Sequence, residues 1–289
     1  MNSSVASRPE AQLPHAVAFG AIISVGFPLN AVALWVLLRH HGLKSPNVVF
    51  MVNLAVSDLL LAASLPLRVY FFATGTWPLT HVSCTLAEAL FTVNVRCSSI
   101  FITFIGVDRL LAIVYPLRSR HVRTACNAAK AAAVAWLFVL VSAVPPTVMF
   151  AKHLNELNAS VCFHCSNLDV TFREATGTFQ CVLVLTLLIV NVVSTSLVSL
   201  TLWRNVKDVS KVNVRVNVML LFAMSLVMFA VCFVPETVSF FITRKNSNLR
   251  CLGALNCCLD PVLYCFSMDT FWKKKEEKDR LKYVCCLPG

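Results

Sequence analysis

The chain has 289 residues, of which 57% are hydrophobic and only 13% are charged. Because a soluble domain averages about 25% charged residues, this composition excludes an ordinary soluble domain and indicates a protein that crosses a membrane several times. The formal net charge of +11 is explained by loop topology and attraction to acidic lipid, so it gives no reason to expect a nucleic-acid partner.

Seven apolar runs follow one another along the chain, and six are long enough to span a hydrocarbon core about 30 Å thick. They predict an all-α fold, a seven-transmembrane helix bundle over residues 15–268, after an extracellular N-terminus at 1–14. The seventh run is marginal in length. The runs cover residues 15–38, 47–73, 84–115, 128–150, 177–203, 212–243 and 251–268.

The placement of lysine and arginine predicts the orientation of these helices. The first, third and fifth connections and the C-terminal tail hold most of the 25 basic residues, which places them in the cytoplasm. Two glycosylation sequons, at Asn2 and Asn158, fall on the opposite side. We therefore expect a multi-pass protein of the plasma membrane with an extracellular N-terminus.

Polar residues in the first two runs are costly in a bilayer and need partners. Asn30 is expected to bond to a neighbouring helix as a structural contact. Asp58 lies near the middle of its run, so it is either protonated or shares a cation or a polar cluster. The candidate members of that cluster are Asn30, Ser98, Asn256 and Asp260.

The third run begins at Cys84 and carries Asp108 and Arg109 near its other end. A charged pair there suggests a function, although two such charges can also simply reach the interface. Glu88 lies one turn deeper than Cys84 and level with Arg68 of the second run. These two residues either form an ion pair or line a ligand pocket.

The connection at 151–176 is the longest on the outer side and contains Cys162 and Cys165. A Cys-x-x-Cys pair can bind zinc or act in redox chemistry. On the oxidising side, with Cys84 nearby, one disulfide from Cys84 is favoured. Cys162 is the preferred partner and Cys165 is the alternative.

The last runs and the tail contain a predicted hinge and a predicted membrane anchor. Pro235 interrupts the sixth run and is expected to act as a hinge. Residues 269–284 form an amphipathic pattern that suits the membrane surface, within a cytoplasmic helix and tail at 269–289. Cys285 and Cys286 follow where palmitoylation is expected.

Taken in order, these motifs resemble the rhodopsin-like (class A) G-protein-coupled receptors. SLPLR, CTLAEAL, CFHCSN and NCCLD are similar to the branch of nucleotide, lysophospholipid and small-carboxylate receptors, most of all the receptors for lysophosphatidylinositol and kynurenate. The residues that carry the family resemblance are Asn30, NLAVSDLLL with Asp58, Cys84, Asp108-Arg109 with AIVYPL, Trp136, Cys232-Phe233-Val234-Pro235 and Asp260-Pro261-x-x-Tyr264.

The resemblance implies a role for each of three groups of residues within the bundle. The coupling switch would be Asp108, Arg109 and Tyr264, with Asp108 holding Arg109 at rest. The hinge that lets helix 6 swing outward would be Phe229, Phe233 and Pro235. The resemblance also implies an allosteric sodium ion bound by Asp58, and no other cofactor is expected. The residues around this ion would be Asp58, Asn94, Ser98, Asn256 and Asp260.

The outer mouth is expected to bind an extracellular anionic ligand, either lipid-like or a small aromatic carboxylate. Arg68, Arg244, Lys245 and Arg250 gather there against one nearby acid, Glu88. The partner inside the cell would be a heterotrimeric G protein of the G12/13 or Gi class, by resemblance. The expected ligand-binding residues are Arg68, Glu88, Phe91, Thr92, Phe233, Phe240 and Arg250.

The chain also departs from the family pattern. The fifth run has Asn191 where the family usually has proline and Ser199 where it usually has tyrosine, and Leu110 follows the arginine of the third run. Only 26 residues separate Pro235 from Pro261, so the outer half of helix 7 is expected to be about two turns short.

The sequence patterns also bear on three other functions. The short connection leaves a non-signalling or truncated receptor variant as an alternative. A membrane transporter is disfavoured because the two halves show no internal repeat. An enzyme is not expected, because the sequence contains no HExxH or GxSxG motif.

Overall fold

The computed structural model describes residues 12–157, 162, 170–204, 212–239 and 247–264, and the regular elements in these ranges are helices. Six of them are long and apolar enough to cross a membrane. The elements are α1 (Leu13–Val36), η1 (Leu37–His41), α2 (Pro46–Thr74), α3 (His81–Val114), α4 (Ala125–Leu157), α5 (Val170–Arg204), α6 (Val212–Met228), η3 (Phe229–Phe233), α7 (Val234–Ser239), α8 (Ser247–Ala254) and a helix at 256–264.

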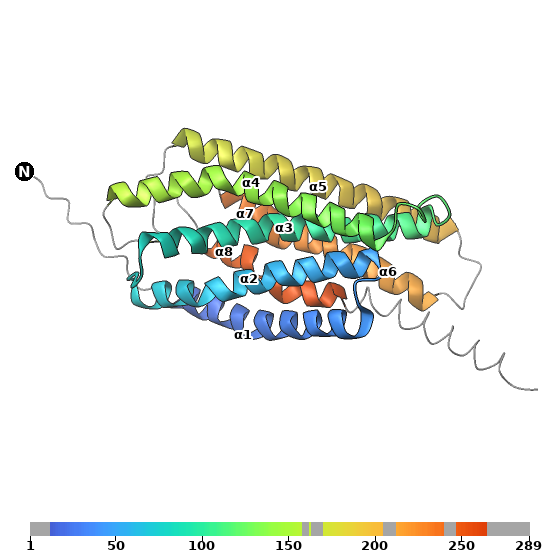
Figure 1. Ribbon diagram of the computed structural model, residues 1–289, viewed down its shortest axis with the longest axis horizontal. Helices are drawn as coiled ribbons and strands as arrows, with labels where there is room; N and C mark the ends of the chain where they lie inside the picture. The colour runs from blue at the N-terminus through green and yellow to red at the C-terminus, as the bar shows by residue number, and fades with distance from the viewer. Residues whose placement is uncertain (1–11, 158–161, 163–169, 205–211, 240–246, 265–289) are drawn as a thin grey trace, which may run out of the picture.

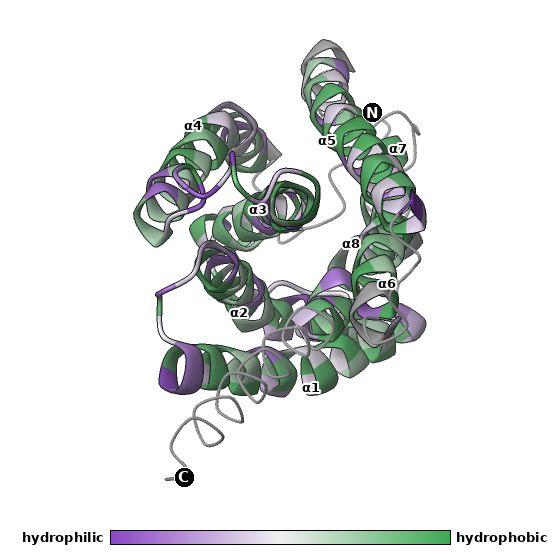
Figure 2. Ribbon diagram, turned by 90° about the vertical axis from the view of Figure 1, so that its right-hand side faces the viewer, coloured by the Kyte–Doolittle hydropathy of each residue, from purple (hydrophilic) through white to green (hydrophobic). Residues whose placement is uncertain are grey.

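The helices lie side by side in one bundle (Figure 1). Helix α3 runs through the middle and contacts α2, α4, α5, α6 and α8 (Figure 2). The sixth predicted run is formed by α6, η3 and α7, and the seventh by α8 and the helix at 256–264. The predicted seven-helix arrangement is therefore confirmed.

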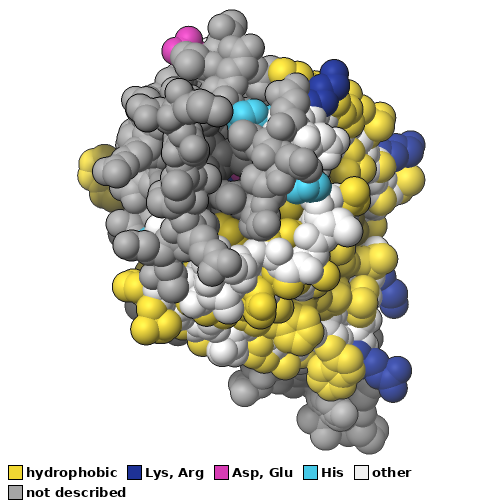
Figure 3. All heavy atoms as spheres, turned by 90° about the vertical axis from the view of Figure 1, so that its left-hand side faces the viewer, with side chains coloured by type: hydrophobic (Ala, Val, Ile, Leu, Met, Phe, Trp, Pro, Cys, Tyr) yellow, Lys and Arg dark blue, Asp and Glu magenta, His cyan; other side chains and the backbone are white. Residues whose placement is uncertain are grey.

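The outer surface of the bundle is apolar and its interior is partly polar, as a bilayer requires. Seen from the end where α2 meets α3, hydrophobic side chains cover much of the described surface (Figure 3). Large exposed apolar residues such as Trp35 and Val134 lie on α1 and α4. Buried polar residues on the inside include Asn30, Asp58, Asn94, Ser98, Asn256 and Asp260.

The first and last helices pack unusually closely. A Cβ atom on Gly26 would meet the Cys257 sulfur at 2.8 Å, so α1 can approach the helix at 256–264 only because this residue is glycine. One turn along, Asn30 donates from Nδ2 to the Cys257 carbonyl oxygen at 2.6 Å. This contact confirms the predicted interhelical role of Asn30.

The sixth span changes its winding just before Pro235. Proline lacks an N–H group and its ring crowds the preceding turn, and the chain accommodates it with the π-helical turn η3 over Phe229–Phe233. The described part of the span extends only to Ser239. By contrast, α8 begins at Ser247, 14 residues before Pro261, so about 20 Å of helix lies outside that proline. The expectation that the outer half of helix 7 is about two turns short stays a prediction, because residues 240–246, which join the two spans, lie outside the described residues.

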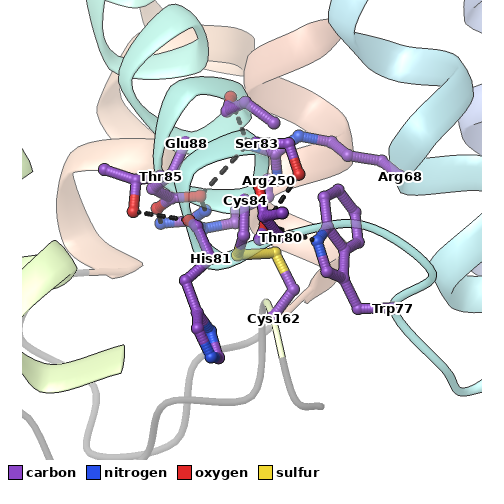
Figure 4. The surroundings of a disulfide bond; sticks show 11 residues. Arg68, Trp77, Thr80, His81, Ser83, Cys84, Thr85, Glu88, Cys162 and Arg250 are labelled. Atoms are coloured by element: carbon purple, nitrogen blue, oxygen red, sulfur yellow. Dashed lines mark hydrogen bonds and ion pairs between the residues drawn. A yellow bond between two sulfur atoms is a disulfide. The ribbon is translucent and has the colours of Figure 1, made fainter. Parts of the chain in front are cut away.

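The outer loop is attached to α3 by a disulfide between Cys84 and Cys162, whose Cα atoms are 5.7 Å apart (Figure 4). The preferred partner is confirmed, and the zinc interpretation of this Cys-x-x-Cys pair is wrong because Cys162 is already bonded. Other predicted features lie outside the described residues and stay predictions. They are Cys165, Asn2, Asn158, Phe240, Cys285, Cys286 and the helix at 269–284.

We expect Cys84→Ala and Cys162→Ala to reduce surface expression sharply and to equal degrees. The bridge joins residues 78 apart, and closing such a loop contributes about 4 kcal/mol. Flow cytometry of an epitope placed at the N-terminus measures the effect, with Cys165→Ala as the matched control. Loss of expression in the Cys165 variant, with normal expression of the Cys162 variant, would contradict the assigned pairing.

Candidate functional site

Three charged side chains from three helices meet at the outer end of the bundle (Figure 4). Glu88 of α3 accepts from Nη2 of Arg68 on α2 at 3.1 Å. Its two oxygens also bind Arg250 of α8, at 2.7 Å from Nη1 and 2.6 Å from Nη2. The Arg68 side chain is only 1% exposed, and it makes a further hydrogen bond to the Ala87 carbonyl oxygen at 3.2 Å. The predicted Arg68–Glu88 ion pair is thus present, and Arg250 joins it.

An aromatic ring supports both arginines. The guanidinium carbon of Arg68 lies 4.7 Å from the centre of the Phe91 ring, and that of Arg250 lies 5.4 Å from it. Such cation–π contacts are favourable, particularly where the cation is desolvated. A Cβ atom on Gly253 would meet Phe91 at 3.3 Å, so a glycine here lets α8 bring Arg250 over the ring.

A fourth charged residue, Glu236 of α7, completes this outer cluster. It is buried and interacts electrostatically with both Arg68 and Arg250. The expectation of a single nearby acid is therefore wrong, because the bundle places α7 beside α8. The sequence did contain an indication of Glu236, because an ionisable residue directly after Pro235 within an apolar run suggests a functional position.

The remaining predicted pocket residues have different surroundings. Thr92 uses its hydroxyl within α3, donating to the Glu88 carbonyl oxygen at 3.2 Å. Phe233 is fully buried in the η3 turn, with its ring centre 5.1 Å from that of Phe229. Arg244, Lys245 and Phe240 lie outside the described residues.

Deeper in the bundle, the predicted polar residues surround Asp58. Asn94 donates to the Asp58 Oδ1 atom at 2.9 Å, and Ser98 donates to the same oxygen at 3.4 Å. Asn256 from the last helix donates to the Asn94 side-chain oxygen at 3.3 Å. The carboxyl group of Asp260 is also fully buried and interacts with that of Asp58.

This Asp58 cluster has the donor set of a hard-cation site. Within the described ranges, both Asp260 oxygens and the second Asp58 oxygen have no hydrogen-bond partner outside these two carboxyl groups. Two adjacent buried carboxyl groups, beside amide and hydroxyl oxygens, match the ligands that hard cations prefer. The residues therefore fit the predicted sodium ion.

At the end of α3 opposite to Cys84, Asp108 has a partner that the sequence did not predict. Arg123, from the turn after α3, donates from Nε to Oδ1 at 2.8 Å and from Nη2 to Oδ2 at 3.0 Å. Arg109 is buried and interacts electrostatically with Asp108, whereas the buried Tyr264 interacts electrostatically with Asp58 and Asp260 and is not brought to this pair by any described contact. Arg123 thus competes with Arg109 for the same carboxylate.

Comparison with known proteins agrees with this architecture. The family model of the 7 transmembrane receptor (rhodopsin family) matches residues 29–264. Human lysophosphatidic acid receptor 6 is 32% identical over 87% of this chain and 80% of its own length. Bovine lysophosphatidic acid receptor 5 is 35% identical over 89% of this chain and 76% of its own length. Human lysophosphatidic acid receptor 4 is 32% identical over 88% of this chain and 75% of its own length. The chain therefore belongs to the rhodopsin family of seven-transmembrane, G-protein-coupled receptors, in the branch that contains lysophosphatidic acid receptors.

Proposed function

We propose that this receptor binds the phosphate head of an anionic lysophospholipid between Arg68 and Arg250 and then activates a heterotrimeric G protein. The observation that carries the proposal is the convergence of two guanidinium groups, the buried one of Arg68 on α2 and the partly buried one of Arg250 on α8, over the Phe91 ring. The names of three relatives, lysophosphatidic acid receptors 4, 5 and 6, support the same ligand class.

Glu88 acts as the resting counter-ion of these arginines. It offers one negative charge to two cations, whereas a phosphate monoester carries nearly two charges and three acceptor oxygens. The phosphate can therefore bind both guanidinium groups bidentately and displace the carboxylate. A small aromatic carboxylate carries the same charge as Glu88 and competes less effectively.

Ligand binding would reach the G protein through the sixth span. Glu236 lies on α7 beside the arginines, and α7 continues into η3 and α6. A change of charge in the outer cluster would shift the position of α7, and the span would bend at Pro235 so that helix 6 moves outward. Arg109, released from Asp108, would then meet a G protein of the Gi or G12/13 class.

The Asp58 cluster would hold an allosteric sodium ion in the resting receptor. Asp58, Ser98 and Asp260 would be its principal ligands, with Asn94 and Asn256 orienting them. A bound cation would neutralise the two buried carboxyl groups and favour the resting arrangement. The receptor would bind its ligand from the outer side of the plasma membrane.

We expect Arg68→Lys to weaken the potency of lysophosphatidic acid by about tenfold or more while surface expression stays normal. Lysine keeps the charge but loses the planar fork that binds phosphate bidentately, and about 1.4 kcal/mol corresponds to a factor of ten. Concentration–response curves of G-protein activation measure the change. Arg39→Lys, at an exposed cytoplasmic position, is the matched control. Unchanged potency in Arg68→Lys would show that Arg68 only balances Glu88.

Replacing the counter-ion gives a prediction with two opposite effects. Glu88→Gln leaves two buried arginines without their shared carboxylate, so the free energy of unfolding should fall by about 3 kcal/mol. The same change removes the group that competes with the ligand, so the potency of lysophosphatidic acid should rise. Thermal unfolding of the purified receptor and concentration–response curves measure the two effects, with the exposed Glu174→Gln as control. A fall in both stability and potency would instead assign Glu88 to ligand binding.

The Asp108 contacts predict opposite signs for two substitutions at the cytoplasmic end. Asp108→Asn releases Arg109 and should raise basal G-protein activation. Arg123→Gln removes the competitor for Asp108, so the carboxylate should hold Arg109 more tightly and basal activation should fall. Arg120→Gln, exposed in the same turn, is the control. A rise in basal activation for both Asp108→Asn and Arg123→Gln would mean that the pair acts together to anchor the turn.

A further inference from the structure

A second buried arginine, Arg96, lies far from the outer cluster, midway along α3. Twelve residues of helix, about 18 Å, separate it from Cys84 on one side and from Asp108 on the other. Its side chain points between α4 and α5, where Nε donates to the Gln180 Oε1 atom at 3.0 Å and Nη1 donates to the Ser142 hydroxyl at 3.0 Å. The residue is only 1% exposed.

Within the described part of the chain, the groups that contact this guanidinium are neutral. Besides Gln180 and Ser142, they comprise the ring of Phe179, whose centre lies 5.0 Å from the guanidinium carbon. A buried cation at this depth is costly without a counter-ion. By contrast, Arg68, Arg250 and Arg123 each have a carboxylate partner.

A second observation points to a missing acceptor at the same place. Gln180 is 2% exposed, and its Nε2 atom has no hydrogen-bond partner among the described residues. Its Oε1 atom already accepts from Arg96. The amide donor of Gln180 and the charged donor of Arg96 are therefore adjacent, and both would be satisfied by an oxyanion.

The ring of Phe179, which packs against the Arg96 guanidinium, is itself partly exposed on the surface of the bundle. Helices α4 and α5 lie on different sides of α3 (Figure 2), and near Arg96 the rings of Phe138 and Phe179 bridge them with centres 6.2 Å apart. Phe138 is 43% exposed and Phe179 is 38% exposed on the outside of the bundle. Rotation of these two rings would open a path from the bilayer to the guanidinium.

We propose that Arg96 and Gln180 form a binding site for the carboxyl group of a single-chain fatty acid that enters between α4 and α5 from the bilayer. The depth of the site selects a carboxyl group over a phosphate, because a carboxylic acid can cross hydrocarbon in its neutral form and then bind Arg96 as the carboxylate once its proton has passed to water, whereas a phosphate monoester stays charged at the interface. The acyl chain would lie on the apolar faces of α4 and α5. This site is independent of the ligand proposed for Arg68 and Arg250.

The test uses the full-length receptor in nanodiscs of neutral phosphatidylcholine, with a diazirine-bearing palmitate as the photo-cross-linking probe. We expect saturable adducts on peptides of α4 and α5 around Phe138 and Phe179. Palmitate should compete at least tenfold better than hexadecanol, which has the same chain without the acid. Arg96→Gln should reduce labelling at least tenfold, whereas Arg68→Gln should leave it unchanged.

Each alternative has its own result. Equal competition by palmitate and hexadecanol, or unchanged labelling of a folded Arg96→Gln receptor, would overturn the proposal and leave Arg96 as a clamp between helices. Loss of labelling in Arg68→Gln would place the fatty acid in the outer cluster instead. If Arg96→Gln does not fold, as judged by thermal unfolding, the competition and adduct positions on the unmodified receptor decide the question.

Discussion

The outer end of this receptor depends on one carboxylate, that of Glu88, held between the buried Arg68 and the partly buried Arg250. Arg68 and Arg250 come from α2 and α8, so the ion pairs join three helices that are distant in sequence. Leaving either cation at that depth without an acid partner would be costly. The disulfide at Cys84, one turn above Glu88, attaches the outer loop to the same part of α3. The interaction that holds these helices together is therefore also the one that the proposed anionic ligand would replace.

The sequence was sufficient to predict features that depend on local composition or on spacing within one helix. Hydropathy predicted the helical spans, and the one-turn offset between Cys84 and Glu88 placed the acid level with Arg68. The partners that were missed, Glu236 and Arg123, depend on which helix faces lie together. Those contacts arise from packing between elements, so the position of a charge within its own run did not reveal its partner.

The departure at Asn191 has a structural account. Where the family usually has proline, Asn191 donates to the Thr103 hydroxyl at 2.8 Å and to the Leu187 carbonyl oxygen at 2.9 Å. A Cβ atom on Gly106 would meet the Asn191 side-chain oxygen at 3.2 Å. Helix α5 is thus attached to α3 by a buried side-chain hydrogen bond. This contact and those of Arg96 link the same two helices at different depths.

The central claim is that a phosphate replaces Glu88 between Arg68 and Arg250. It is tested most directly by a cryo-electron-microscopy structure of the receptor bound to lysophosphatidic acid. The account predicts phosphate density within hydrogen-bonding distance of both guanidinium groups, with the Glu88 carboxylate turned away from them. An intact Arg68–Glu88–Arg250 cluster, with the phosphate bound elsewhere on the receptor, would contradict it.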